Sequence, residues 1–266
     1  MMNLPTQSSH SSTGARAAPL IFAVLQILTP ILPSLGVGQP IGDQSDSVRT
    51  LITPAGWAFS IWGALYTGSL VFALFQALPA QRHNRLLAKI RWPAAGAFLG
   101  NALWALYTQS FGLSVISALI ILVTLVCLLR IFRTIGTWPS RFTRAESWCA
   151  VLPLSALASW LTVASIVNIA ATLRFHGIEG GESATTIASI VLVVGGGIAA
   201  IALVSSRGSP PYALVFLWAL SAIYAAGGQR AAPVAVAAGL AAILVIGAAL
   251  MGLRRDRAGQ WLSRAT

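Results

Sequence analysis

The chain has 266 residues, of which 56% are hydrophobic and only 9% are charged, and its mean hydropathy is +0.78. Soluble domains carry about 25% charged residues, so this composition excludes an ordinary soluble protein and indicates an integral membrane protein. A net charge of +11 would suggest nucleic-acid binding in a soluble protein, but here the basic residues lie between apolar runs. We therefore expect no nucleic acid as a partner, and we interpret the charge as a determinant of topology in the lipid bilayer.

Apolar runs follow one another along the chain without the alternation that a β-barrel requires. A helix needs about 20 apolar residues to cross a hydrocarbon core of roughly 30 Å. The predicted fold class is all-α, a polytopic membrane helix bundle with about eight transmembrane helices. The predicted spans are 19–38, 57–79, 93–110, 113–131, 149–173, 184–204, 211–228 and 232–252.

The two ends of the chain are polar. Residues 1–18 are Ser-rich and predict a disordered cytoplasmic tail. A cleaved signal peptide is not expected, because the run after Arg16 contains Pro30 and Pro33 and lacks a small-x-small cleavage site. Residues 253–266 predict a basic cytoplasmic tail.

The distribution of charge supports an even number of spans. If the N-terminus is cytoplasmic, every Lys and Arg lies on the inner side except Arg49, Arg174 and Arg230. The outer side also receives most of the acidic residues, namely Asp43, Asp46, Glu179 and Glu182. The expected location is therefore the cell (inner) membrane, with several spans and with both termini in the cytoplasm.

Three spans each place a tryptophan and a neutral polar residue on one helix face, at i, i+3 and i+4 spacing. The stripes are Phe59, Trp62, Tyr66, Ser69 and Ala73 in the second span, Ala94, Ala97, Asn101, Trp104 and Thr108 in the third, and Trp160, Ala164 and Asn168 in the fifth. An unsatisfied carboxamide facing lipid costs several kcal/mol. We therefore expect Asn101 and Asn168 to face other helices or a cavity.

Each of these residues also has a structural interpretation. An intramembrane Asn more often joins helices than contacts a ligand, and core packing is as good an account of Trp62, Trp104 and Trp160 as a pocket wall. Tryptophans near span ends are typical of interfacial belts, and this role is predicted for Trp57, Trp92, Trp138, Trp148 and Trp261.

The last three spans are rich in Gly and Ala, which permits close helix packing. This packing could involve the first five helices or a second copy in a homodimer, and the sequence leaves both alternatives open. The residues concerned include Gly195, Gly196, Gly197, Ala199, Gly239 and Gly247.

No Asp, Glu, Lys, Arg or His is predicted at the middle of a span. Cys127 and Cys149 are too few for a disulfide framework or a Cys-based metal site. Acid–base catalysis needs a tuned titratable group, and a metal centre needs several ligands brought together. We therefore expect no catalytic residues, no metal ion and no enzymatic activity.

Three segments resemble a known family, in the right order along the chain. "WAFSIWGALY" (57–66), "GNALWALY" (100–107) and "SWLTVASIVNIAATL" (159–173) are similar to motifs of helices two, three and five in the tryptophan-rich sensory protein or translocator protein (TspO/MBR) family. The resemblance implies a five-helix membrane domain at residues 19–174. The three transmembrane helices predicted at 184–252 are additional to the five helices of the family.

The resemblance also implies an intramembrane pocket for porphyrins and other flat or sterol-like hydrophobic molecules. Its motif positions, together with Phe59 from the same stripe, give the predicted ligand-binding set: Phe59, Trp62, Tyr66, Asn101, Trp104, Trp160, Ala164 and Asn168. No cofactor is expected apart from a porphyrin or haem bound as the ligand.

The leading hypothesis is a sensory, regulatory or transport-linked membrane protein that binds such a molecule, with the bilayer and this ligand as its partners. The first alternative is a secondary transporter that uses the three extra helices, although no buried charge for ion coupling and no convincing repeat is present. The second alternative is a membrane enzyme acting on a lipid or pigment through the acidic residues of the outer loops.

Overall fold

The protein is described by a computed structural model, which covers residues 13–255. Residues 1–12 and 256–266, which hold most of the two predicted tails and Trp261, lie outside the described residues. The helical elements are α1 (Thr13–Leu28), η1 (Thr29–Leu35), α2 (Ile41–Ser47), η2 (Gly56–Ser60), α3 (Ile61–Ala77), η3 (Pro79–Gln81), α4 (Arg85–Phe111), α5 (Val115–Gly136), α6 (Arg144–Glu146), η4 (Ser147–Val151), α7 (Leu152–Phe175), η5 (Gly181–Ser183), α8 (Ala184–Ser205), α9 (Pro210–Ile223), η6 (Tyr224–Gly228) and α10 (Ala232–Arg255).

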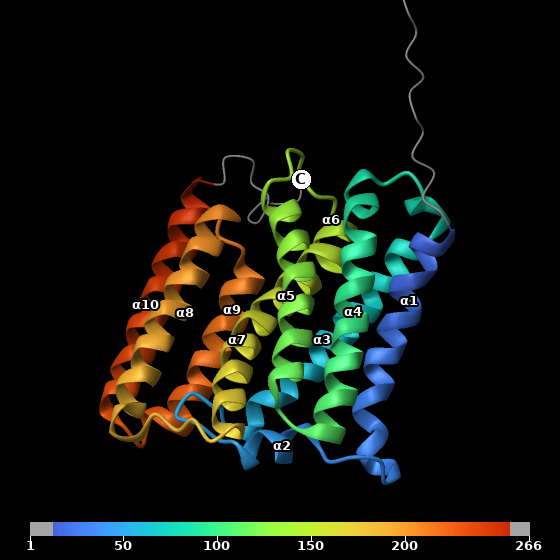
Figure 1. The fold of residues 1–266 in the computed structure, drawn as a ribbon. Helices are drawn as coiled ribbons and strands as arrows, with labels where there is room; N and C mark the ends of the chain where they lie inside the picture. Colours follow the sequence, from blue (N-terminus) through green and yellow to red (C-terminus); the bar gives the residue numbers. More distant parts are fainter. Residues whose placement is uncertain (1–12, 256–266) are drawn as a thin grey trace, which may run out of the picture.

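The long helices form a bundle in which α4 lies between α1 and α5, and α8 lies against α10, as Figure 1 shows. Within residues 13–255, seven helical segments are long and apolar enough to cross a membrane. The chain is thus an all-α, multi-pass membrane protein, which confirms the predicted fold class.

Helix α4 is not among those seven segments, although it contacts both α1 and α5 along the bundle. Its hydropathy is low because Lys89 and Arg91 lie near its start and Asn101, Thr108 and Gln109 lie further along. These last three side chains are all buried in the bundle. In Figure 1 α4 lies between α1 and α5 and runs along the bundle with them, and α1 begins at the same face of the bundle at which α10 ends.

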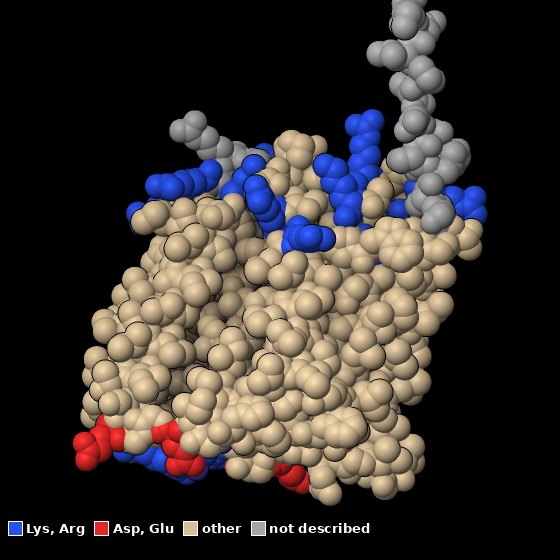
Figure 2. Space-filling model, in the orientation of Figure 1, with Lys and Arg blue, Asp and Glu red and all other residues tan. Residues whose placement is uncertain are grey.

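The two faces of the bundle differ in charge, with an apolar belt between them (Figure 2). One face, here called the basic end, carries the links α3–α4, α5–α6 and α8–α9 together with the start of α1 and the end of α10. The opposite face, here called the acidic end, carries α2 and the links α4–α5, α7–α8 and α9–α10. This separation follows the pattern expected from the sequence.

Helix α1 begins at Thr13, so residues 13–18 are helical, and the predicted disordered tail 1–18 is wrong over this part. Ala and Arg are strong helix formers, and the helix start is also held by tertiary contacts. The Arg16 guanidinium donates to the carbonyl of Ala77, and Gln76 Nε2 donates to the carbonyl of Arg16 at 2.8 Å. At its other end α1 passes into the 3-10 helix η1, which contains Pro30 and Pro33.

Helix α7 lies at the centre of the bundle. In the segment Arg144–Phe175, 78% of the 18 residues that form its apolar stretch are buried inside the protein. This share is larger than in any other candidate span among the described residues. Helix α7 contacts α3, α5, α8 and α9. Ser159 Oγ donates to the carbonyl of Tyr212 at 2.7 Å, and the Tyr212 hydroxyl donates to Thr162 Oγ1 at 3.1 Å, so two hydrogen bonds join α7 to α9.

Helices α8 and α10 pack closely through small residues. A Cβ atom at Gly196 would lie 2.7 Å from Ala241 Cβ and 2.8 Å from Ala241 Cα, whereas one at Gly197 would meet nothing within 4 Å. Gly196 therefore serves packing within the chain. Gly197, Gly239 and Gly247 face open space, and the homodimer remains a prediction.

We predict that Gly196→Ala destabilises the protein and that Gly197→Ala does not. The added methyl at 196 would force α8 and α10 apart, at a cost of about 1–3 kcal/mol. At 197 the gain in helix propensity, roughly 0.5–1 kcal/mol, is not offset by a clash. The melting temperatures of the two purified variants in the same detergent test this, and equal values would contradict the packing.

Candidate functional site

The three predicted tryptophan stripes converge between α3, α4 and α7. The Trp62 ring stacks on Trp104 with centroids 6.2 Å apart and planes at 27°, and it meets Trp160 edge-on at 6.0 Å. Phe59 contacts Trp160 edge-on at 6.4 Å, and Tyr66 lies 5.0 Å from Trp62. The sequence stripes therefore predicted one aromatic cluster correctly from three separate helices.

The turn before α3 sets the direction of this cluster. Residues 56–60 form the 3-10 helix η2 directly before α3, so the path of η2 sets the direction of Phe59, within it, and of Trp62, in the first turn of α3. The turn is fixed to α9: the Ala55 amide donates to the carbonyl of Ala222 at 3.0 Å, and Trp218 Nε1 donates to the carbonyl of Ala58 at 3.3 Å. The position of Trp62 therefore depends on a helix from the last part of the chain.

The cluster borders a cavity, here called the aromatic cavity, whose volume is about 40 Å³. Pockets for drug-sized ligands measure about 300–1,000 Å³, so the side chains nearly fill this space in the conformation described. The described residues that line it include no titratable side chain; they are Ile41, Ser45, Pro54, Phe59, Trp62, Trp104, Leu113, Trp160, Val163, Ala164, Val167, Asn168 and Ala171.

A larger groove of about 470 Å³ adjoins this cavity on the side of η1 and α2. Trp62 and Ile41 line both spaces. The other lining residues of the groove are Pro30, Pro33, Ser34, Pro40, Tyr66 and Gln109. Trp62 and Ile41 therefore form the partition between a small inner cavity and a larger outer groove.

Asn168 is the polar centre of the aromatic cavity. Its Oδ1 accepts from Trp104 Nε1 at 3.4 Å, and its Nδ2 donates to Ser117 Oγ at 3.2 Å. The Ser117 hydroxyl in turn donates to the carbonyl of Ser114 at 2.7 Å. One carboxamide thus joins α4, α5 and α7, and it satisfies the expectation that Asn168 faces other helices or a cavity.

Asn101 has a different environment. Its Nδ2 donates to Gln26 Oε1 at 3.1 Å, and both residues are buried. Asn101 is not part of the aromatic cavity wall, so the structure brings it to the α1–α4 contact and not to the other predicted site residues. Tyr66 likewise lines the outer groove and not the inner cavity.

Two indole N–H groups at the site have no partner. Trp62 Nε1 and Trp160 Nε1 are buried, and neither makes a hydrogen bond within residues 13–255. A buried donor without a partner costs about 1–3 kcal/mol, whereas Trp104 satisfies its N–H at Asn168. The wall of the aromatic cavity therefore holds two unused donors.

No sequence pattern indicated several of the residues that line the aromatic cavity. Ile41 and Ser45 come from α2, a seven-residue helix that closes the acidic end of the bundle in Figure 1. Pro54 comes from the link that follows it. The Gln39 amide donates to the carbonyl of Gln109 at 2.8 Å, which holds the start of α2 against α4. A short polar segment such as "IGDQSDS" has the composition of an ordinary loop. Its contribution to the cavity wall is therefore known only from the folded structure.

The arrangement suits binding of an apolar molecule with a few polar edges. Within the described part of the chain, no group of three or more His, Cys, Asp or Glu side chains could hold a metal ion. The aromatic rings would supply apolar contact area, and the carboxamide of Asn168 and the two indole donors would orient the molecule through hydrogen bonds to its polar edges.

Comparison with protein families shows a match over most of the chain. The family model described as TSPO-like protein matches residues 16–251, which is most of the chain and includes α8, α9 and most of α10. No curated protein and no solved structure matches the chain. TSPO-like proteins are generally non-enzymatic binding proteins. With its helical bundle and apolar spans, the chain therefore belongs to the family of TSPO-like membrane proteins.

Proposed function

We propose that this protein binds a flat hydrophobic or aromatic small molecule, of the tetrapyrrole or the sterol and isoprenoid class, in the aromatic cavity. The observation that carries the proposal is the pair of buried indole donors, Trp62 Nε1 and Trp160 Nε1, beside an apolar cavity. A ligand with polar edges would satisfy donors that otherwise destabilise the fold. Occupancy of this site is the first step of a sensory, regulatory or transport-linked role.

The aromatic rings would provide most of the binding free energy. Stacked and edge-on contacts with an aromatic ligand contribute about 0.5–1.5 kcal/mol each beyond the area they bury. Asn168 would orient a polar edge, because its carbonyl already accepts a hydrogen bond at the cavity wall. The absence of titratable groups among the described lining residues favours binding over proton transfer.

The ligand must create part of its own space. The inner cavity measures only about 40 Å³, below the roughly 300–1,000 Å³ of ordinary ligand pockets, whereas the adjoining outer groove measures about 470 Å³. Rotation of Trp62, or displacement of Ile41 with α2, would join them. The proposed route of entry therefore runs from the acidic end, past η1 and α2, to the tryptophan cluster.

We predict saturable binding of protoporphyrin IX to the purified protein, with haem as a second probe, and weaker binding by Trp160→Phe. This substitution keeps a ring but removes one donor, and loss of a hydrogen bond worth about 0.5–1.5 kcal/mol lowers affinity roughly 3- to 10-fold. Quenching of intrinsic fluorescence measures the affinity. Trp148→Phe is the matched control, because Trp148 is 70% exposed and lies before α7, outside both cavities.

A second variant tests the cavity itself. Ala164→Phe places a ring in the lining of the aromatic cavity and should abolish the saturable component while the protein still folds. Binding that never saturates in the wild type, or binding that Ala164→Phe and Trp160→Phe leave unchanged, would refute the proposed site.

We also propose that the protein lies in the cell (inner) membrane with its basic end, and so both termini, in the cytoplasm. The support is the charge difference between the two ends in Figure 2, because cytoplasmic loops carry an excess of Lys and Arg. The acidic end would then face outward, and a ligand would enter the outer groove from that side.

Cysteine labelling tests this orientation. In a Cys127→Ser, Cys149→Ser background, we predict that Glu182→Cys in η5 reacts with a membrane-impermeant maleimide in intact spheroplasts. Ala80→Cys in η3 should react only after the membrane is permeabilised. Both positions are exposed at opposite ends of the bundle. The reverse labelling pattern would show that the basic end faces outward.

A further inference from the structure

A second large cavity lies at the acidic end, between α7 and α8, with a volume of about 490 Å³. We call it the arginine pocket, because Arg49, Arg174 and Arg230 line it. These are the three basic residues that the charge pattern assigned to the otherwise acidic side of the membrane. Arg49 lies in the link after α2, Arg174 in the last turn of α7 and Arg230 in the link before α10, so the fold gathers in one place charges that the sequence spreads over 182 positions, from 49 to 230.

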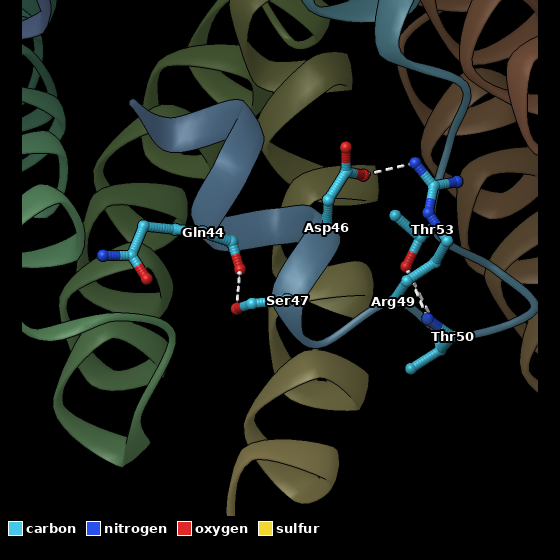
Figure 3. A network of polar contacts seen from close by, with 6 residues as sticks. All are labelled: Gln44, Asp46, Ser47, Arg49, Thr50 and Thr53. Atoms are coloured by element: carbon cyan, nitrogen blue, oxygen red, sulfur yellow. Dashed lines mark hydrogen bonds and ion pairs between the residues drawn. The ribbon is translucent and has the colours of Figure 1, made fainter. Parts of the chain in front are cut away.

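The pocket holds more positive than negative charge. Arg49 pairs with Asp46, as Figure 3 shows, and Arg174 pairs with Glu179 at 3.2 Å. Of these two carboxylates only Glu179 is part of the lining. The side chain of Arg230 makes no hydrogen bond or ion pair with any other residue that the structure describes. One guanidinium at the pocket is therefore free for an external anion.

Local contacts hold the link that carries Arg49. Thr53 Oγ1 accepts from the Thr50 amide at 2.9 Å (Figure 3), which closes a tight turn directly after Arg49. Leu51 follows Thr50 in this turn. The carbonyl oxygen of Leu51 lies where the Cβ atom of any other residue at position 227 would be, so the backbone can approach this closely only at Gly227. This approach brings η6, and with it Arg230, against the Arg49 link.

The rest of the pocket wall is apolar. Ile52, Ala170, Ala188 and Val191 form its inner part, and Ile52 and Val191 also line a narrow apolar cavity of about 20 Å³ between α7, α8 and α9. The space thus runs from the charged end of the bundle along α7 and α8 into the apolar belt. Figure 2 shows the surface hollowed on the side between α8 and the central helices.

We propose that the arginine pocket binds an anionic lipid of the surrounding leaflet. Its phosphate headgroup would lie among the three guanidinium groups, which match phosphate geometry with paired N–H donors, and one acyl chain would lie along α7 and α8. The leaflet is the source because the apolar rim residues Leu173, Ile178 and Ile187 are exposed and would contact lipid. A small water-soluble anion would leave this apolar wall unused.

The site is separate from the aromatic cavity, with which it shares no lining residue. The inference therefore does not depend on the proposed porphyrin or sterol-like ligand. Basic pockets between transmembrane helices are a general means of holding anionic headgroups. Here the pocket lies where the first part of the chain meets α8 and the α9–α10 link, so a bound lipid would connect them.

The test is native mass spectrometry of the full chain in a neutral detergent, with phosphatidylglycerol and phosphatidylcholine of the same acyl chains as probes. The wild type should bind phosphatidylglycerol at least tenfold more tightly. Arg230→Gln should reduce this preference several-fold with both ion pairs left intact, and the triple variant Arg49→Gln, Arg174→Gln, Arg230→Gln should abolish it. The control triple Arg85→Gln, Arg130→Gln, Arg141→Gln removes equal charge from the basic end and should keep the preference.

Two further measurements separate the pocket from general charge effects. Ala188→Phe fills the apolar part of the pocket with every arginine present, and it should lower phosphatidylglycerol binding about tenfold at an unchanged melting temperature. Millimolar inorganic phosphate should not displace the lipid. The inference is overturned if the arginine triple keeps its preference, if the wild type binds both lipids equally, or if phosphate alone displaces the lipid. Trp160→Phe should keep the lipid preference, which distinguishes failure of this site from failure of the aromatic one.

Discussion

The bundle depends on one constraint: a polar group inside a bilayer must find its partner within the protein. Helix α7 meets this constraint at several side chains that join it to neighbouring helices. Asn168 connects α7 to α4 and α5, and Ser159 and Thr162 connect it to α9 through Tyr212. These contacts fix the centre of the bundle. Some buried polar groups of residues 13–255 have no partner, among them Ser155 Oγ and Ser165 Oγ of α7, and of these groups only the indole donors of Trp62 and Trp160 line the aromatic cavity.

Much of the fold could be predicted because a bilayer limits the alternatives. Apolar length indicates helices, and the charge of the links indicates their direction, so eight crossings follow from the sequence even though α4 is too polar for a simple hydropathy criterion. The start of α1 could not be predicted in this way. Helix formation at residues 13–18 depends on the contacts of Arg16 with α3, and such contacts leave no local pattern.

The candidate site was predicted in part for the same reason. Helical spacing fixes which residues share a face, so Trp62, Trp104 and Trp160 could be expected to point inward together. Spacing does not identify the neighbouring helix, and this is why two similar residues differ: Asn101 meets Gln26 of α1, whereas Asn168 meets Trp104 and Ser117. The arginine pocket was hidden altogether, because Arg49 and Arg230 come from links whose approach depends on the close contact between Gly227 and Leu51, and Arg174 comes from the end of α7.

The last three helices take part in the aromatic site, although none of them contributes a residue to its lining. Helix α9 accepts a hydrogen bond from the turn before η2 and donates one to η2, through Ala222 and Trp218, and Trp57 packs edge-on against Trp218 at 4.8 Å. Because η2 sets the direction of Phe59 and Trp62, a change in the position of α9 would alter the partition between the aromatic cavity and the outer groove. The first five helices therefore require α9 to present their aromatic residues, which gives a physical reason why the family match continues to residue 251.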